Sequence, residues 1–141
     1  MATDGNDFSR SMGIGTSGLR AQAARMRVIS ENIANADSTG QTAGGDPYRR
    51  KIPTFTSELD RTLDARVVTL GRVRPDASAF RVRYEPNNPA ADAAGNVKYP
   101  NVNSVVEMTD MRQAQRSYEA NLNIISAPRR MIQRTLDILK A

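Results

Sequence analysis

The sequence contains no cysteine, no histidine and no tryptophan among its 141 residues. Without these side chains the protein cannot form a disulfide, a zinc site of cysteine and histidine, or a catalytic pair of serine or cysteine with histidine. An enzyme would have to work with carboxylates, lysine or tyrosine alone, and no grouping of those residues in the sequence suggests a catalytic site. We therefore predict that the protein is not an enzyme and binds no cofactor.

Large apolar side chains are also scarce, since only 39% of the residues are hydrophobic and 5% are aromatic. We do not expect a thick hydrophobic core in a chain of this composition. No apolar run reaches the length of a membrane span, and the polar, acidic first residues do not resemble a cleavable signal peptide. Export from the cytoplasm would therefore use a route that removes no signal peptide. Asp76, Glu85 and Asp92 could form a carboxylate cluster for a hard metal ion, but nothing in the sequence fixes their spacing, so we do not predict a metal site.

The net charge of +5 and the pI of about 10.1 raise the question of nucleic-acid binding. The excess of basic residues is spread over the middle and the end of the chain, and aromatic residues do not alternate with it. A solvated basic surface is therefore the favoured interpretation. A basic helical nucleic-acid-binding protein remains the alternative function, and a membrane-surface helix is disfavoured because the bases are not clustered.

The last forty or so residues, 101–141, show the clearest pattern. One apolar row repeats in steps of seven, and a second row accompanies it. The first row is Met111, Tyr118, Ile125, Ile132 and Leu139, and the second is Met108, Leu122 and Leu136. Two such rows predict a long helix whose apolar seam needs a partner. Ser104 and Glu107 fit a capping box at its start.

A second seam lies near the amino terminus. Met12, Leu19, Met26 and Ile33 are spaced by seven, with Gln22, Ile29 and Ala36 beside them. This spacing predicts a helix from about residue 12, preceded by a disordered segment 1–11 and ending near residues 35–40, where Asn, Asp, Ser and Gly favour a turn.

The middle of the chain is interpreted as loops around a β-hairpin. Residues 41–47 predict a loop, and residues 57–63 a short helical turn. The runs 66–74 and 80–84 are rich in β-branched residues or alternate in polarity, so we predict that they pair across a turn at Pro75. Residues 85–96 contain two prolines and a Gly-Asn turn, which predicts a long irregular segment.

Several stretches resemble the axial proteins of the bacterial flagellum, and within that group the rod proteins. The resemblance lies in Ser30–Gly40, Asp46–Lys51, Tyr84–Asn103 and Arg116–Asn121. It implies a structural subunit of the proximal rod that polymerises into a torque-transmitting shaft for motility. It also implies terminal helices paired as a coiled coil, a middle segment forming outer contacts, and export without cleavage through the flagellar type III apparatus. The partners it implies are other copies, other rod proteins and the rod-to-ring junction protein of the basal body, in the rod that spans the periplasm.

The predicted fold is thus mainly α, with long terminal helices paired as a coiled coil and a small β-hairpin and irregular middle segment. The predicted divisions are an amino-terminal helix at 1–40, a loop and hairpin segment at 41–100 and a carboxyl-terminal helix at 101–141. Such thinly apolar helices should become firmly ordered only in an assembly. Pro128 departs from the family's continuous helix and predicts a kink or break there.

The candidate interaction residues fall into two groups. The helix-packing and subunit-interface group is Leu19, Met26, Ile29, Asn32, Ile33, Asn35, Met111, Tyr118, Leu122, Ile125, Ile132, Leu136 and Leu139. The outer-segment group is Tyr48, Arg49, Tyr84, Pro86, Asn88, Pro89, Asp92 and Tyr99.

Overall fold

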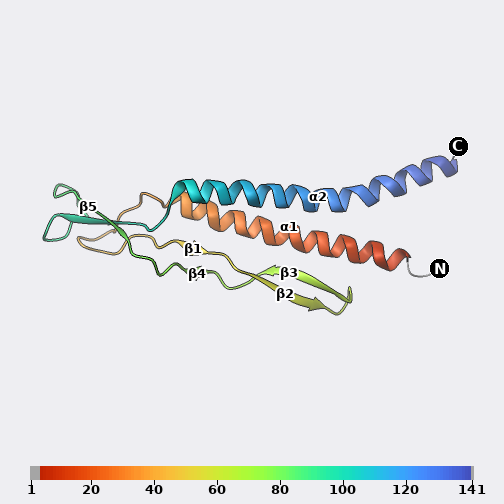
Figure 1. The fold of residues 1–141 in the computed structure, drawn as a ribbon, viewed down its shortest axis with the longest axis horizontal. Helices are drawn as coiled ribbons and strands as arrows, with labels where there is room; N and C mark the ends of the chain where they lie inside the picture. Colours follow the sequence, from red (N-terminus) through yellow and green to blue (C-terminus); the bar gives the residue numbers. More distant parts are fainter. Residues whose placement is uncertain (1–3, 141) are drawn as a thin grey trace. The chain divides into compact units, whose positions relative to one another are not determined.

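A computed structural model describes residues 4–140 of the chain (Figure 1). It has one helix at each end, α1 (Asp4–Ala34) and α2 (Ser104–Lys140), and strands between them. The strands are β1 (Lys51–Ile52), β2 (Phe55–Asp60), β3 (Ala65–Leu70), β4 (Arg74–Pro75), β5 (Arg81–Tyr84) and β6 (Asn96–Tyr99). They form three separate two-stranded antiparallel sheets, β1 with β4, β2 with β3, and β5 with β6.

The chain divides into two compact units, each assembled from segments distant in sequence. Unit 1 comprises the described residues up to 25 together with 55–71 and those from 113 onward, and unit 2 comprises 26–54 and 72–112. Most of the buried apolar side chains lie in unit 2, namely Val28, Ile29, Ala36, Ala90, Val97 and Val102. Unit 1 buries only Ala21 and Ala114 among its described apolar side chains. The earlier division at residues 40 and 100 stays a prediction.

The predicted mainly helical fold with a coiled-coil pair is wrong. The two helices hold about half of the chain, and three small antiparallel sheets account for much of the rest. Within unit 1, α1 approaches α2 through glycines, because a Cβ built on Gly15 or Gly18 would lie 3.0 Å from Ile125 or 2.8 Å from Asn121. A coiled coil needs bulky apolar knobs from both helices, and Gly15 and Gly18 supply none.

The strand pairing also differs from the prediction. The two strand-like runs do become β3 and β5, but they do not pair with each other. Each forms its own hairpin, β3 with β2 and β5 with β6. The predicted helical turn at 57–63 is instead mostly strand β2, because Phe55–Asp60 pairs along its whole length with Ala65–Leu70. The segment predicted as irregular ends in β6, which begins at Asn96.

The helix ends differ from the prediction in two places. Helix α1 already covers Asp4 to Ser11, so the predicted disorder is wrong for residues 4–11, and residues 1–3 lie outside the described part. Its end at Ala34 is as predicted. Helix α2 is capped by Asn103 rather than by a box of Ser104 and Glu107, because the Asn103 Oδ1 accepts hydrogen bonds from the amides of Val105 and Val106 at 3.1 and 3.4 Å.

Pro128 lies inside α2 and does not end it. Figure 1 shows the helix curving in its blue carboxyl-terminal part. The prediction of a break is therefore wrong, and the curvature agrees with the predicted kink.

Candidate assembly surfaces

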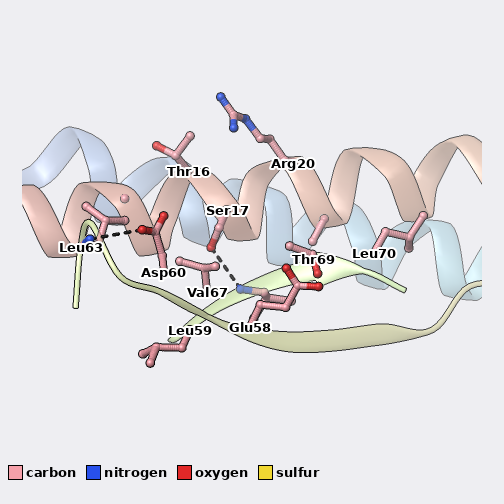
Figure 2. Close-up of a pocket in the computed structure, with 13 residues that line it drawn as sticks. Thr16, Ser17, Arg20, Glu58, Leu59, Asp60, Leu63, Val67, Thr69 and Leu70 are labelled. Atoms are coloured by element: carbon pink, nitrogen blue, oxygen red, sulfur yellow. Dashed lines mark hydrogen bonds between the residues drawn. The ribbon is translucent and has the colours of Figure 1, made fainter. Parts of the chain in front are cut away.

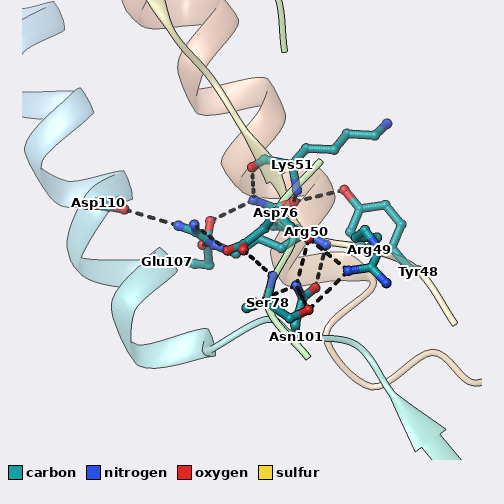
Figure 3. A network of polar contacts seen from close by, with 10 residues as sticks. Tyr48, Arg49, Arg50, Lys51, Asp76, Ser78, Asn101, Glu107 and Asp110 are labelled. Atoms are coloured by element: carbon teal, nitrogen blue, oxygen red, sulfur yellow. Dashed lines mark hydrogen bonds and ion pairs between the residues drawn. The ribbon is translucent and has the colours of Figure 1, made fainter. Parts of the chain in front are cut away.

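A buried carboxylate holds unit 2 together. Glu107 in the first turns of α2 is only 1% exposed, and its Oε1 accepts a hydrogen bond of 2.6 Å from Arg50 Nε (Figure 3). Its Oε2 accepts a second hydrogen bond, of 3.0 Å, from Asn32 Nδ2 on α1. A carboxylate with so little access to water requires such compensation on both oxygens.

Asn32 is fully buried and uses both ends of its side-chain amide. Besides Glu107, its Nδ2 donates to the carbonyl of Lys51 at 2.8 Å, while its Oδ1 accepts from the Lys51 amide and from the Tyr48 hydroxyl, each at 2.9 Å. Asn32 therefore fixes β1 to α1, because its side-chain amide bonds the main chain of Lys51 in the way that a neighbouring strand would. Burial, aided by the carboxylates of Glu31 and Glu107, raises the pKa of Tyr48 to about 12.

Arg50 links this centre to the sheet β1–β4. Its guanidinium lies 3.4 Å from Asp76 and 3.9 Å from Asp110 in addition to its contact with Glu107. Burial alone would lower the pKa of Arg50, but Glu107 and Asp76 raise it above its ordinary value, so the guanidinium stays positively charged. Hydrogen bonds from Ser78, followed by the charge of Arg50, lower the pKa of Asp76.

The β5–β6 hairpin is stiffened by Glu85 at its turn. The Glu85 carboxylate accepts hydrogen bonds from Asn88 Nδ2 at 3.0 Å and from the Tyr99 hydroxyl at 2.9 Å. Both bonds lower the pKa of Glu85, and the bond to Glu85, followed by burial, raises the pKa of Tyr99. Gly95 adopts a φ of 79°, and a Cβ there would lie 2.9 Å from the ring of Tyr84, so the turn is tightly closed.

In unit 1, the β2–β3 hairpin lies along α1. Arg10 binds its turn twice, through Nε to the Leu63 carbonyl at 2.9 Å and through Nη2 to Asp64 at 2.7 Å. The Leu63 side chain occupies the space above Gly13, where a Cβ would lie 2.4 Å from it. Farther along, the Ser17 hydroxyl accepts a 3.3 Å hydrogen bond from the Val68 amide. Between hairpin and helix remains a cleft of about 700 Å³ (Figure 2).

The end of α2 has no cover within the described chain. Every residue from 129 to 140 is exposed, and the apolar row continues along it. We call Ile132, Leu136 and Leu139 the terminal stripe; they are 47, 45 and 77% exposed. Such a row of large apolar side chains in water is typical of a surface that binds another protein.

The helix group of candidate residues is distributed over both units. Ile29 and Asn32 are buried, while Leu19, Met26, Ile33, Asn35, Met111, Tyr118 and Ile125 are half-buried. Leu122 is exposed together with the terminal stripe. The assignment of these residues to subunit contacts stays a prediction.

The outer group lies wholly in unit 2. Tyr84, Pro86, Pro89 and Asp92 are exposed, while Tyr48, Arg49, Asn88 and Tyr99 are half-buried. Arg49 stacks 4.1 Å from the centre of the Phe80 ring and donates to the carbonyls of Asp76 and Ser78.

Sequence reasoning missed the central role of Glu107 and Arg50. The only signal was a single acid in an otherwise apolar and neutral first turn, and it was assigned to capping. Across residues 4–140 no group of three potential metal-binding side chains comes together, and no helix is apolar enough over a sufficient length to cross a membrane.

Comparison with known proteins places these surfaces in context. Residues 12–40 match the family described as flagella basal body rod protein, and residues 93–138 match the family described as flagellar basal body rod FlgEFG protein C-terminal. The chain is 52% identical to the flagellar basal-body rod protein FlgC of Agrobacterium fabrum, over 91% of this chain and 92% of that protein. It is 35% identical to FlgC of Aquifex aeolicus, covering 95 and 98%, and 39% identical to FlgC of Salmonella typhimurium, covering 89 and 92%.

Proposed function

The chain belongs to the FlgC family of flagellar basal-body rod proteins, and we propose that its exposed helix end and outer loop hold it in the rod. As a family member it is a structural subunit of the flagellar basal body, not an enzyme, and it assembles with other basal-body rod proteins. The relatives give no support to the nucleic-acid-binding alternative.

The terminal stripe is the observation that carries the proposal. The last twelve residues of α2 have no packing partner in the described chain, so their helix is supported only by propagation from the preceding turns. Burying each large aliphatic side chain contributes about 1.5 to 3 kcal/mol when it is fully covered. Ile132, Leu136 and Leu139 therefore supply a strong drive for association, and neighbouring rod subunits are the partners that the family provides.

The outer group supplies a second, more polar contact. The exposed Tyr84 and Pro86 lie on a turn that Glu85 keeps rigid through Asn88 and Tyr99. A surface that is already ordered loses little entropy on binding. We assign this turn to contacts outside the helical part of the rod, with further copies, other rod proteins or the junction protein between rod and ring.

In this proposal the subunit transmits torque in the proximal rod because several neighbours clamp it at both surfaces. It reaches the rod through the flagellar type III export apparatus without losing a signal peptide. The three predicted divisions of the chain would then correspond to two helical segments and one outer segment.

The test is Leu136→Asp in cells whose own copy of the gene has been deleted. We expect the variant to be made and exported but to stop rod assembly, so that cells lack hooks and do not swim, because a carboxylate cannot be buried in an apolar contact. Asn123→Asp places the same charge on the opposite, exposed side of the same helix and should leave the cells motile. Motile cells with normal hooks in the Leu136→Asp strain would contradict the proposal.

A further inference from the structure

One edge of strand β2 has no neighbouring strand within the described chain. Its sheet contains two strands, and the residues from Phe55 to Leu59 are exposed. The Val68 amide donates to Ser17 Oγ, so the main-chain groups of Val68 point away from β2. Ser57 lies opposite Val68 in the ladder, and its N–H and C=O therefore point away from β3. The same holds for Phe55 and Leu59, because the direction repeats at every second residue.

Strand β5 has a free edge of the same kind. The Glu85 amide donates to the Gly95 carbonyl at 2.8 Å, on the side of β6. The alternate residues Val82 and Tyr84 therefore direct their N–H and C=O groups away from β6. All four residues of β5 are exposed, with Val82 at 59% and Tyr84 at 72%. Free strand edges of this kind bind a further strand through main-chain hydrogen bonds.

We propose that the free edge of β2 in one copy pairs antiparallel with the free edge of β5 in a second copy. The two hairpins then form one four-stranded sheet in the order β3–β2–β5–β6. Within the described chain β2 and β5 belong to separate sheets and to different units, so the two edges do not pair with each other there. The inference rests on the proposed function and deepens it, because it names the partner of the strand that leads into the outer turn.

One antiparallel register pairs the whole of β5 with β2. It places Leu59 opposite Val82, and Ser57 then lies opposite Tyr84. Both pairs join residues whose N–H and C=O groups point across the new contact, as a ladder of hydrogen bonds requires. Antiparallel pairing is also slightly more stable per residue than parallel pairing.

The same register brings opposite charges together. Glu58 lies opposite Arg83, and Asp60 lies opposite Arg81, which favours the pairing. Asp60 already accepts two amide hydrogen bonds in its own turn, and Arg81 already donates to two carbonyls, so Glu58 and Arg83 are the pair that gains most. No parallel register sets both acids opposite both arginines while keeping all of β5 opposite β2.

The faces of the two hairpins also agree. Leu59 is directed away from α1 (Figure 2). In the other hairpin Val97 is fully buried and lies opposite Arg83, so Val82 and Tyr84 are on the opposite, exposed face. Leu59 and Val82 therefore share the outer face of the joint sheet, and each hairpin keeps its covered face on the inner side.

The contact joins two different strands, so each copy can pair at both strands at once. Such a heterologous contact continues as a ring or a helical array, which suits a subunit of a rod. Pairing of β2 with β2 would be two-fold symmetric and would close after two copies. Pairing of β5 with β5 would set arginine opposite arginine in the registers that pair most of the strand.

The absence of cysteine in this chain allows a direct test by cross-linking. Cells without their own copy of the gene would produce the full chain with Ser57→Cys and Tyr84→Cys together, and isolated basal bodies would be oxidised and analysed on a non-reducing gel. Opposite residues of this type have Cα atoms about 5.5 Å apart, which a disulfide can span. We expect the chain to shift from the monomer band to dimers and higher multiples. The matched control, Ser57→Cys with Val82→Cys, moves one cysteine about 7 Å along the strand and should stay largely monomeric.

A second experiment tests the register through its charges. In the chain with Ser57→Cys and Tyr84→Cys, the further change Glu58→Arg should lower the cross-linked fraction about fivefold, because it sets like charges opposite each other. Adding Arg83→Glu makes the charges opposite again and should restore the cross-linked fraction. A fraction that stays low in the double reversal would overturn the assigned register.

Three other results would overturn the inference. A faster-migrating monomer band would show that β2 and β5 pair within one chain. Dimers formed with Ser57→Cys alone would show that β2 pairs with β2 of a second copy. Normal basal bodies without a cross-link between Ser57→Cys and Tyr84→Cys would show that other partners cover the two edges, and the proposed function would stand. If Leu136→Asp leaves rods intact, the proposed function fails independently of the cross-linking result.

Discussion

Glu107→Gln should destabilise unit 2 far more than the loss of one charge on a surface. The substitution keeps the shape of the side chain but removes the negative charge opposite Arg50. In the wild type, Arg50 Nε and Asn32 Nδ2 each donate to one oxygen of the Glu107 carboxylate. The glutamine has an NH₂ group in place of one of these oxygens, so one of the two donors would face another donor. Asn32 cannot simply reverse its amide, because its Oδ1 already accepts two hydrogen bonds.

The expected magnitude follows from the contacts that survive. Removing one partner of a buried ion pair costs about 3 to 5 kcal/mol. Arg50 keeps Asp76 at 3.4 Å and Asp110 at 3.9 Å, so its charge is not left alone. We therefore expect the lower end of that range, a loss of about 3 kcal/mol in the free energy of unfolding.

Urea unfolding followed by circular dichroism measures this free energy, and hydrogen exchange at the Lys51 amide locates the loss. The matched control is Asp110→Asn, which also removes a carboxylate near Arg50 but from a more exposed, longer contact. It should cost about 0 to 1 kcal/mol. A Glu107→Gln protein within about 0.5 kcal/mol of the wild type would refute the reasoning. The pair Arg50→Met with Glu107→Leu should recover most of the loss, since apolar replacements of a buried pair are often neutral or better.

Two further predictions concern unit 2. Asn103→Ala should lower the free energy of unfolding by about 1 kcal/mol, because it removes the cap of α2, whereas Ser104→Ala should have little effect; equal losses in urea unfolding would contradict the assignment. For Tyr48, folding raises the pKa from 10.0 to about 12, so its contribution to stability is complete below pH 10 and is lost as the pH rises toward 12. Tyr48→Phe should therefore show a shallower loss of stability than the wild type across this range in unfolding titrations, and identical slopes would argue against the shift.

The two long helices could be predicted from the sequence because their apolar spacing extends over several turns. The strand pairing could not. Strand β2 contains Ser57, Glu58 and Asp60, residues with low strand propensity, so it does not stand out as a strand. Its pairing with β3 depends on a turn in which Asp64 adopts a φ of 46°. A positive φ is uncommon for a residue other than glycine, so the sequence gives little indication of this turn.

The coiled-coil pairing of the two helices was predicted wrongly for a related physical reason. Spacing in steps of seven shows which side of α2 is apolar, but it does not identify what covers that side. In the structure, α1 meets α2 through Gly15 and Gly18, and the β2–β3 hairpin lies along α1 with Leu63 against Gly13. The network around Asn32 escaped prediction because it joins residues from four separate segments, and single-sequence reasoning has no signal for such pairing.

The placement of large and small apolar side chains is the strongest argument that this chain is completed by assembly. Among the described residues, the buried apolar side chains are mostly alanine and valine, whereas leucines, isoleucines and methionines stand exposed on α2. In a self-sufficient domain the large side chains would be the buried ones, since they gain most from leaving water. Unit 2 instead obtains its defined arrangement from Glu107, Arg50 and Asn32, whose hydrogen bonds tolerate no other register. On the function proposed above, such a subunit keeps its large apolar surface available, and the energy of burying it would be released when a neighbouring rod subunit binds.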